Sequence, residues 1–275
     1  MSSPWDHKIS DNSTNLPRAK HALPILALTF LACLAATAGA PGVFKAQPFD
    51  LREVRLLNGP FKHAMELDRQ YLLSLDVDRL LHSFRVNAGL PSSADPLGGW
   101  EELKSEVRGH FIGHYMTACA LMYASTGDER LKEKGALVVA GLAECQARIG
   151  TGYLSAFPSE FFDRVEAQKQ VWAPYYTLHK LYAGLLDMHV HCGNQQALEV
   201  CKKFADWVIE RNARLSDDQM QKMLGNEHGG MNETLANLYG ITGQEKYLKI
   251  AQRFNHLAVI KPAAQKEDKL TGLHA

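Results

Sequence analysis

The sequence has no net charge and no basic stripe. Its 30 Lys and Arg residues balance 30 Asp and Glu residues, and no window collects the basic residues. Proteins that bind nucleic acid usually carry a basic patch on one face. The composition therefore argues against nucleic acid and favours a neutral partner.

The sequence also lacks paired cysteines. It has five cysteines, and no two of them are spaced as C-x-x-C. This absence argues against a zinc knuckle or a redox pair, and we expect no metal ligands within this chain. Cys119 and Cys145 fall within helical apolar patterns, where a free cysteine serves as a small hydrophobe.

No membrane-spanning run is expected in the mature chain. The apolar run from Ala22 to Ala36 is about 15 residues long, which is short for a span. Arg18 and Lys20 precede it, and the small residues Ala36 and Ala38 follow it at signal-peptidase spacing. We therefore predict a signal peptide over residues 1–38, a linker over 39–48, and export to the periplasm or the medium.

Two alternatives to this leader stay open. A lipoprotein would be anchored at Cys33, but Phe30 and Leu31 fit poorly before a lipidated cysteine. A buried N-terminal helix is the second alternative, because the 21 residues before the apolar run are long for a signal peptide.

Strand signals are nearly absent, and a helical repeat organises residues 49–275. Tyr123–Glu129 and Tyr239–Glu245 both match Y-x-x-T-G-x-E, and His189–Gln195 occupies the same frame between them. Their glycines are 66 and 50 residues apart, so the repeat averages about 58 residues. Such a period argues against tetratricopeptide repeats, whose period is about 34 residues.

Each of these glycines is expected to end one helix just before the next begins. Apolar residues recur at helical spacing on both sides of each glycine, which predicts helical hairpins. A first helix over about 62–82 and three hairpins follow from this pattern. We predict an all-α fold, an incomplete (α/α)6 toroid of helical hairpins with roughly half the ring present.

Long connections join the hairpins at the end opposite the glycine turns, which we call the mouth. They run over about 148–173 and 213–225 and are rich in Gly, aromatic and polar residues. Loops of this length in a compact domain usually carry function. We therefore expect the functional site at the mouth.

Histidines recur near the mouth at similar distances from the turn glycines. His110, His179 and His228 lie 17, 14 and 15 residues before their glycines, and His274 would open a fourth unit. His114 lies one helical turn after His110, on the same face. Singly each is more readily explained as a capping or core histidine, and His110 with His114 could hold zinc, although the Glu of H-E-x-x-H is absent. Their recurrence favours a shared site.

Aromatic residues and carboxylates accompany the histidines. Aromatic faces stack on sugar rings, while His and carboxylate groups bond sugar hydroxyls. We predict a carbohydrate substrate, bound by His110, His114, Tyr153, Trp172, His179, Glu227, His228, Glu233 and His274.

Several segments resemble one known family. They are Gly109–Tyr115, Gly152–Leu154, Trp172–Lys180, Glu227–Glu233 and Leu270–Ala275, with Phe49–Leu56 similar to the start of the same domain. In this order they resemble glycoside hydrolase family 127. The resemblance implies a truncated catalytic domain over 49–275, a glycosidase acting on β-L-arabinofuranosides of plant-derived glycans.

The resemblance also implies a zinc-bound cysteine nucleophile, with a glutamate and further cysteines as zinc ligands. These lie later in the family's barrel, so we expect the nucleophile and the acid/base beyond Ala275 and zinc only in the full-length enzyme. Two other functions stay open: a non-catalytic carbohydrate-binding remnant, and a polysaccharide lyase on a similar toroid with Tyr or His as base.

Overall fold

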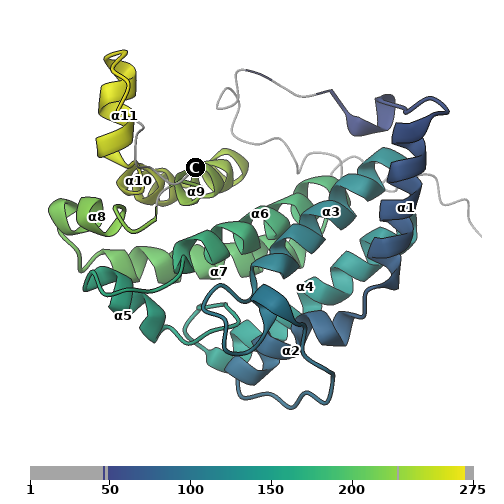
Figure 1. Ribbon diagram of the computed structural model, residues 1–275, viewed down its shortest axis with the longest axis horizontal. Coiled ribbons are helices and arrows are strands. Elements are labelled where there is room, and N and C mark those ends of the chain that lie inside the picture. The colour runs from purple at the N-terminus through teal and green to yellow at the C-terminus, as the bar shows by residue number, and fades with distance from the viewer. Residues whose placement is uncertain (1–45, 47–48, 228, 270–275) are drawn as a thin grey trace, which may run out of the picture. The chain divides into compact units, whose positions relative to one another are not determined.

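The computed structural model describes residues 46, 49–227 and 229–269 of the chain. Across these residues the chain forms helices and no strands. Three helical hairpins make up most of it: α3 (His110–Thr126) with α4 (Glu129–Ile149), α6 (Pro174–Cys192) with α7 (Gln195–Asn212), and α9 (Met231–Thr242) with α10 (Glu245–Arg253) (Figure 1). Two successive helices, α1 (Pro60–Ser74) and α2 (Val77–Asn87), precede them.

The hairpins pack as two tracks of helices. The first helices contact one another in the order α1, α3, α6, α9, and the second helices in the order α2, α4, α7, α10. Of these neighbours, α3 and α6 lie side by side, and both run from the mouth to their turns. This arrangement confirms the predicted all-α, toroid-like fold class; that half of a ring is present stays a prediction.

The turn glycines end their helices as predicted. Gly127, Gly193 and Gly243 have φ values of 74°, 69° and 68°, a left-handed conformation that side chains disfavour. The side chains of Asp128 and Asn194 then accept backbone N–H bonds at the start of the next helix. Local sequence thus specifies these reversals.

The predicted single helix over about 62–82 is wrong. Leu75 is extended, with φ −68° and ψ 134°, and it separates α1 from α2. The Asp76 side chain accepts from the N–H groups of Asp78 and Arg79 and so begins α2. The first unit therefore consists of two separate helices, joined without a turn glycine.

Short helices occupy the segments between and beyond the hairpins. They are the 3-10 helices η1 (Leu51–Glu53) and η2 (Gly99–Glu101), and the α-helices α5 (Glu160–Glu166), α8 (Asp217–Met223) and α11 (Leu257–Ala264). α5 and α8 lie in the two predicted long connections and contact each other. No helix within the described residues is both long and apolar enough to cross a membrane.

The backbones of α3 and α6 approach closely. A Cβ atom at Gly113 would lie 2.2 Å from the carbonyl oxygen of Lys180, and one at Gly184 would lie 2.4 Å from that of Gly113. Both neighbours are main-chain atoms, so only glycine fits. This contact fixes the level at which the mouth residues of the two helices meet.

Candidate functional site

Glu101 organises the mouth end of α3. Its Oε2 accepts from the Gly109 N–H at 2.6 Å, and its Oε1 accepts from the Phe111 N–H at 2.9 Å. A carboxylate at this position satisfies free N–H groups and complements the positive end of the helix dipole. The loop before α3 is thereby fixed to the helix.

Glu101 also orients His110, the first residue of α3. His110 Nδ1 lies 2.7 Å from Glu101 Oε1 and 2.9 Å from the carbonyl oxygen of Val107. Burial by itself would lower the pKa of His110, but the hydrogen bond and charge of Glu101 raise it above its usual value. His110 is held in one orientation by two acceptors.

Glu227 accepts a backbone N–H at the start of α6, as Glu101 does at the start of α3. Its Oε1 accepts from the Tyr176 N–H at 2.6 Å. Its Oε2 is shielded from solvent and has no hydrogen-bond partner among the residues that the structure describes. Burial raises the pKa of Glu227 to about 8, against the opposing effect of backbone N–H groups from Tyr176 and Tyr175.

A row of rings connects the two helix ends. The His110 ring centroid lies 6.0 Å from that of His114 and 5.9 Å from that of Tyr176, and the Tyr176 and His179 centroids are 6.4 Å apart. His114 Nε2 is 3.5 Å from the Tyr176 hydroxyl. The row thus offers ring faces and hydrogen-bonding nitrogens on one surface.

His179 is mostly buried, with its side chain 15% exposed. Gly230 approaches it so closely that a Cβ there would lie 2.1 Å from His179 Nδ1. Burial lowers the pKa of His179 to about 4, with further lowering by the charges of Lys180 and His114. The ring is therefore neutral at neutral pH, when it can both donate and accept a hydrogen bond.

A pair of tryptophans continues the row outward. Trp100 lies 6.0 Å from His110 and 5.7 Å from Trp172, ring centroid to ring centroid. The backbone N–H of Trp172 donates to Glu106 Oε2 at 2.9 Å, and Arg164 forms an ion pair with the other carboxylate oxygen of Glu106. Aromatic faces beside imidazole and carboxylate groups suit the binding of a neutral sugar.

Comparison with known families identifies this arrangement. Residues 53–275 match the sequence model of the β-L-arabinofuranosidase GH127 catalytic domain. The chain belongs to the GH127 family. This confirms the resemblance found from the sequence motifs, and with it the assignment to a family of glycosidases.

A solved GH127 structure shares the fold. It is a β-L-arabinofuranosidase from Geobacillus stearothermophilus T6, with a TM-score of 0.56 and 18% sequence identity over 80% of this chain. The match covers 36% of that protein, so this chain spans about a third of its length. No curated protein matches the chain.

The GH127 fold brings most of the predicted site residues to the mouth. His110, His114, Trp172 and His179 belong to the row of rings, and Glu227 lies at the start of α6. Glu233 is 69% exposed, with its Oε2 3.9 Å from His179 Nε2. His228 and His274 lie outside the described residues.

The similar distances from the turn glycines suggest that each of these histidines begins its helix, but His179 does not. It lies more than one turn into α6, which starts at Pro174. Because Gly113 contacts the backbone of Lys180, His114 is level with His179, whereas His110 is one turn closer to the mouth. His110 and His179 therefore do not occupy equivalent positions along their helices, although their distances from the turn glycines are similar.

The prediction that Tyr153 binds substrate is wrong. Its side chain is 3% exposed, its hydroxyl donates to the carbonyl oxygen of Phe157 at 2.7 Å, and its ring lies 4.6 Å from that of Trp207. Tyr153 is a core residue that fixes the connection between α4 and α5. An aromatic residue in a Gly-rich loop gave no signal of its burial.

Three residues of the mouth, Glu101, Tyr176 and Glu106, were not among the predicted site residues. Glu101 and Tyr176 touch His110 directly, and Glu106 positions Trp172. A carboxylate shortly before a helix start is a usable signal for a capping role. Nothing in the sequence spacing indicates the contact between Glu106 and Trp172, which are 66 residues apart.

The described residues do not fit the family's zinc centre. No three His, Cys, Asp or Glu side chains among them gather closely enough to hold a metal ion. Cys119, Cys145, Cys192 and Cys201 are free and buried, as expected for core thiols. Burial raises the pKa of each of these thiols, which disfavours the thiolate that a metal needs.

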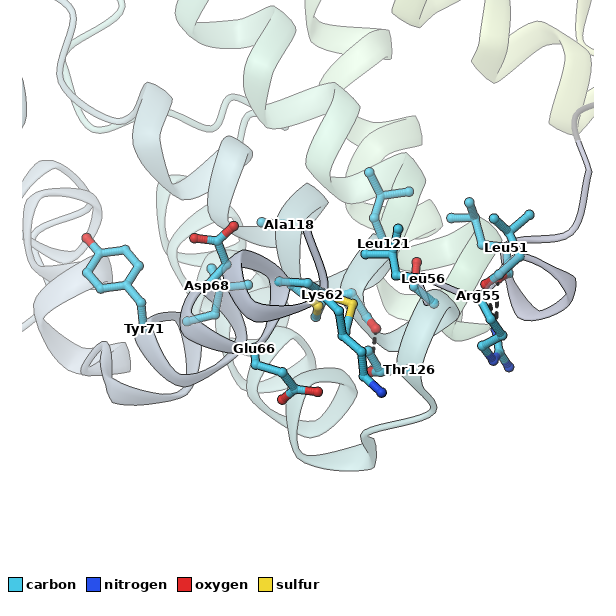
Figure 2. Close-up of a pocket in the computed structure, with 15 residues that line it drawn as sticks. Leu51, Arg55, Leu56, Lys62, Glu66, Asp68, Tyr71, Ala118, Leu121 and Thr126 are labelled. Carbon is cyan, nitrogen blue, oxygen red and sulfur yellow. Dashed lines mark hydrogen bonds between the residues drawn. The ribbon is translucent and has the colours of Figure 1, made fainter. Parts of the chain in front are cut away.

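A separate cavity lies away from the mouth (Figure 2). It has a volume of about 700 Å³ and lies between η1, α1 and α3, with Leu51, Lys62, Tyr71 and Leu121 among its lining residues. Most of its lining is apolar, and none of the histidines of the mouth reaches it. We therefore place the candidate site at the mouth and not in this cavity.

Proposed function

We propose that this chain acts, within a GH127 glycoside hydrolase, on β-L-arabinofuranosyl linkages of plant-derived glycans. The observation that carries the proposal is the match of residues 53–275 to the GH127 catalytic domain. The row of rings at the mouth supports it, because the row combines aromatic faces with neutral imidazole nitrogens.

The described residues supply the sugar-binding part of this function. His179, neutral at neutral pH, offers one donor and one acceptor to sugar hydroxyls, and His114 and Tyr176 line the same surface. The zinc and cysteine nucleophile that the family implies would supply the bond-breaking chemistry when present. We assign no step of bond cleavage to the described residues.

Hydrolysis of the two anomers of 4-nitrophenyl L-arabinofuranoside tests the proposal. In a GH127 enzyme that carries this chain together with the family's zinc and cysteine centre, we expect nitrophenol release from the β anomer and none from the α anomer. His179→Ala should weaken binding of the β anomer by about tenfold or more, the cost of losing hydrogen bonds in a buried site. Cleavage of the α anomer alone would contradict the assignment.

A carbohydrate-binding function without hydrolysis is the second candidate. It is favoured by the row of rings, whose aromatic faces and imidazole nitrogens can hold a sugar without any bond cleavage. Saturable binding of methyl β-L-arabinofuranoside without any cleavage would support it. Failure to bind this sugar at all would overturn both candidates.

We further propose that the chain is exported through a signal peptide over residues 1–38. The support is the sequence pattern of basic residues, apolar run and small residues described above. Mass spectrometry of the protein recovered outside the cytoplasm should give Gly39 as its first residue. A lipidated Cys33 would instead show a lipoprotein, and an N-terminus at Met1 would refute export by this route.

A further inference from the structure

Two tryptophan side chains at the mouth are largely uncovered. Trp100 is 65% exposed and Trp172 is 47% exposed. Their ring planes meet at 84°, with centroids 5.7 Å apart, so the two indoles form an open corner. We call this pair the tryptophan corner.

The tryptophan corner is held rigidly from below. Trp100 precedes Glu101, whose carboxylate is bound by two backbone N–H groups and contacts His110. The backbone of Trp172 is held by Glu106, which pairs with Arg164. A preorganised aromatic surface loses little conformational entropy when a ligand binds.

The tryptophan corner is continuous with the sugar-binding row. Trp100 contacts His110, His110 contacts Tyr176, and Tyr176 contacts His179. Trp100 is the most exposed member of this path at 65%, whereas Tyr176 is 38% exposed and the side chains of His110 and His179 are 10% and 15% exposed. A ligand longer than one sugar ring, held at His179, would extend outward over the corner.

We propose that Trp100 and Trp172 form a binding subsite for a second sugar unit, linked to the unit that His179 and His114 bind. The ligand class is a neutral oligosaccharide of at least two units, whose C–H face packs on an indole face. This inference rests on the proposed function, since it names the length of the substrate at the same site.

Saturation-transfer difference NMR on the full chain tests the subsite. The probes are methyl β-L-arabinofuranoside and the corresponding β-linked arabinofuranosyl disaccharide, observed before any product accumulates. We expect the disaccharide to bind about fivefold to tenfold more tightly, the range that corresponds to one aromatic packing contact. Protons of both sugar units should receive saturation.

Variants separate this subsite from the rest of the mouth. Trp100→Ala and Trp172→Ala should each reduce the affinity for the disaccharide more than the affinity for the monosaccharide. Trp100→Phe keeps an aromatic face and should retain most of the difference. Tyr71→Ala removes an aromatic residue of α1 that is 56% exposed and should change neither affinity.

The results distinguish failure of the subsite from failure of the function. Equal affinities for the two sugars in the wild-type chain, or an equal loss of both in Trp100→Ala, would overturn the subsite while sugar binding stands. Self-association that buries the tryptophans, detected as concentration-dependent quenching of their fluorescence, would also overturn it. Binding of neither sugar would overturn the proposed function and the subsite together.

Discussion

Glu227 is a carboxyl group whose two oxygens have different surroundings. Oε1 accepts from the Tyr176 N–H, whereas Oε2 is buried without a partner among the described residues. Burial raises the pKa of Glu227 to about 8, so the folded protein holds this group protonated at neutral pH. A neutral carboxylic acid can donate a hydrogen bond, which a carboxylate cannot.

This raised pKa predicts how stability depends on pH. The folded state binds more protons than the unfolded state between about pH 4.5 and pH 8, so the free energy of unfolding falls as pH rises through this range. One proton contributes at most about 1.4 kcal/mol per pH unit. We expect Glu227→Gln to reduce the loss of stability between pH 6.5 and pH 8, measured by urea unfolding.

Glu233→Gln is the matched control, because that side chain is 69% exposed. It should leave the dependence of the free energy of unfolding on pH unchanged. His179 has the opposite effect, because its pKa of about 4 in the folded state makes stability rise with pH between about pH 4 and pH 6.5. Measurements above pH 6.5 avoid this effect. An unaltered slope in Glu227→Gln would show that Glu227 is ionised in the fold.

At the scale of helices, the contact between α3 and α6 rests on two glycines. We expect Gly113→Ala and Gly184→Ala each to lower the free energy of unfolding by about 2 kcal/mol or more, because the new Cβ would meet main-chain atoms. Thermal unfolding followed by circular dichroism measures this as a lower melting temperature.

Gly98→Ala provides the comparison, since Gly98 has an ordinary φ of −95° and a Cβ added there would meet nothing within 4 Å. It should change the melting temperature little. A Gly113→Ala protein as stable as Gly98→Ala would mean that the two helices can separate without cost.

Arg211 attaches α7 to α5. It pairs with Glu166, whose side chain is 14% exposed, and with Asp163, whose side chain is 64% exposed. Removing the buried charge leaves Arg211 poorly compensated, so Glu166→Gln should cost about 1–3 kcal/mol. Asp163→Asn should cost less than about 1 kcal/mol, as exposed pairs do. Chemical denaturation of both variants checks this order.

Sequence alone predicts the hairpins because their signals are local. The left-handed glycines and the capping residues Asp128 and Asn194 act within a few residues of each turn. The break at Leu75 and Asp76 was missed, since the helical apolar pattern continues across it. α5 was missed because seven residues are too few to show a period.

At the scale of the whole chain, apolar side chains remain exposed on and before α1. Leu57 is 87%, Phe61 is 78% and Tyr71 is 56% exposed. Clusters of exposed apolar residues promote association. We expect the chain to self-associate at micromolar concentrations in sedimentation velocity, and the double variant Phe61→Ser with Tyr71→Ser to shift it toward monomer.

Leu137→Ser tests whether self-association depends on the apolar residues of α1 or on exposed apolar residues anywhere. Leu137 is 61% exposed on α4, away from α1 in the sequence, and its replacement should leave association unchanged. Equal effects of the two replacements would indicate nonspecific aggregation. Monomeric wild-type protein at all concentrations would refute the expectation.

Only those site residues that recur with the helical repeat could be predicted from the sequence. The spacing of His110, His114 and His179 from their turn glycines places them at one end of the hairpins, and the structure brings their rings together. Contacts such as Glu106 with Trp172, or Glu227 with Tyr176, depend on tertiary packing of loops distant in sequence. No local pattern encodes them.

The glycine contact between α3 and α6 has a consequence for how the mouth of this chain tolerates change. Because main chain meets main chain there, the distance between the two helices does not depend on the side chains at the mouth. Replacements of His114, Tyr176 or Trp172 should therefore leave the packing of the hairpins beneath them intact. The residues that shape the mouth and the residues that set the helix spacing are separate sets.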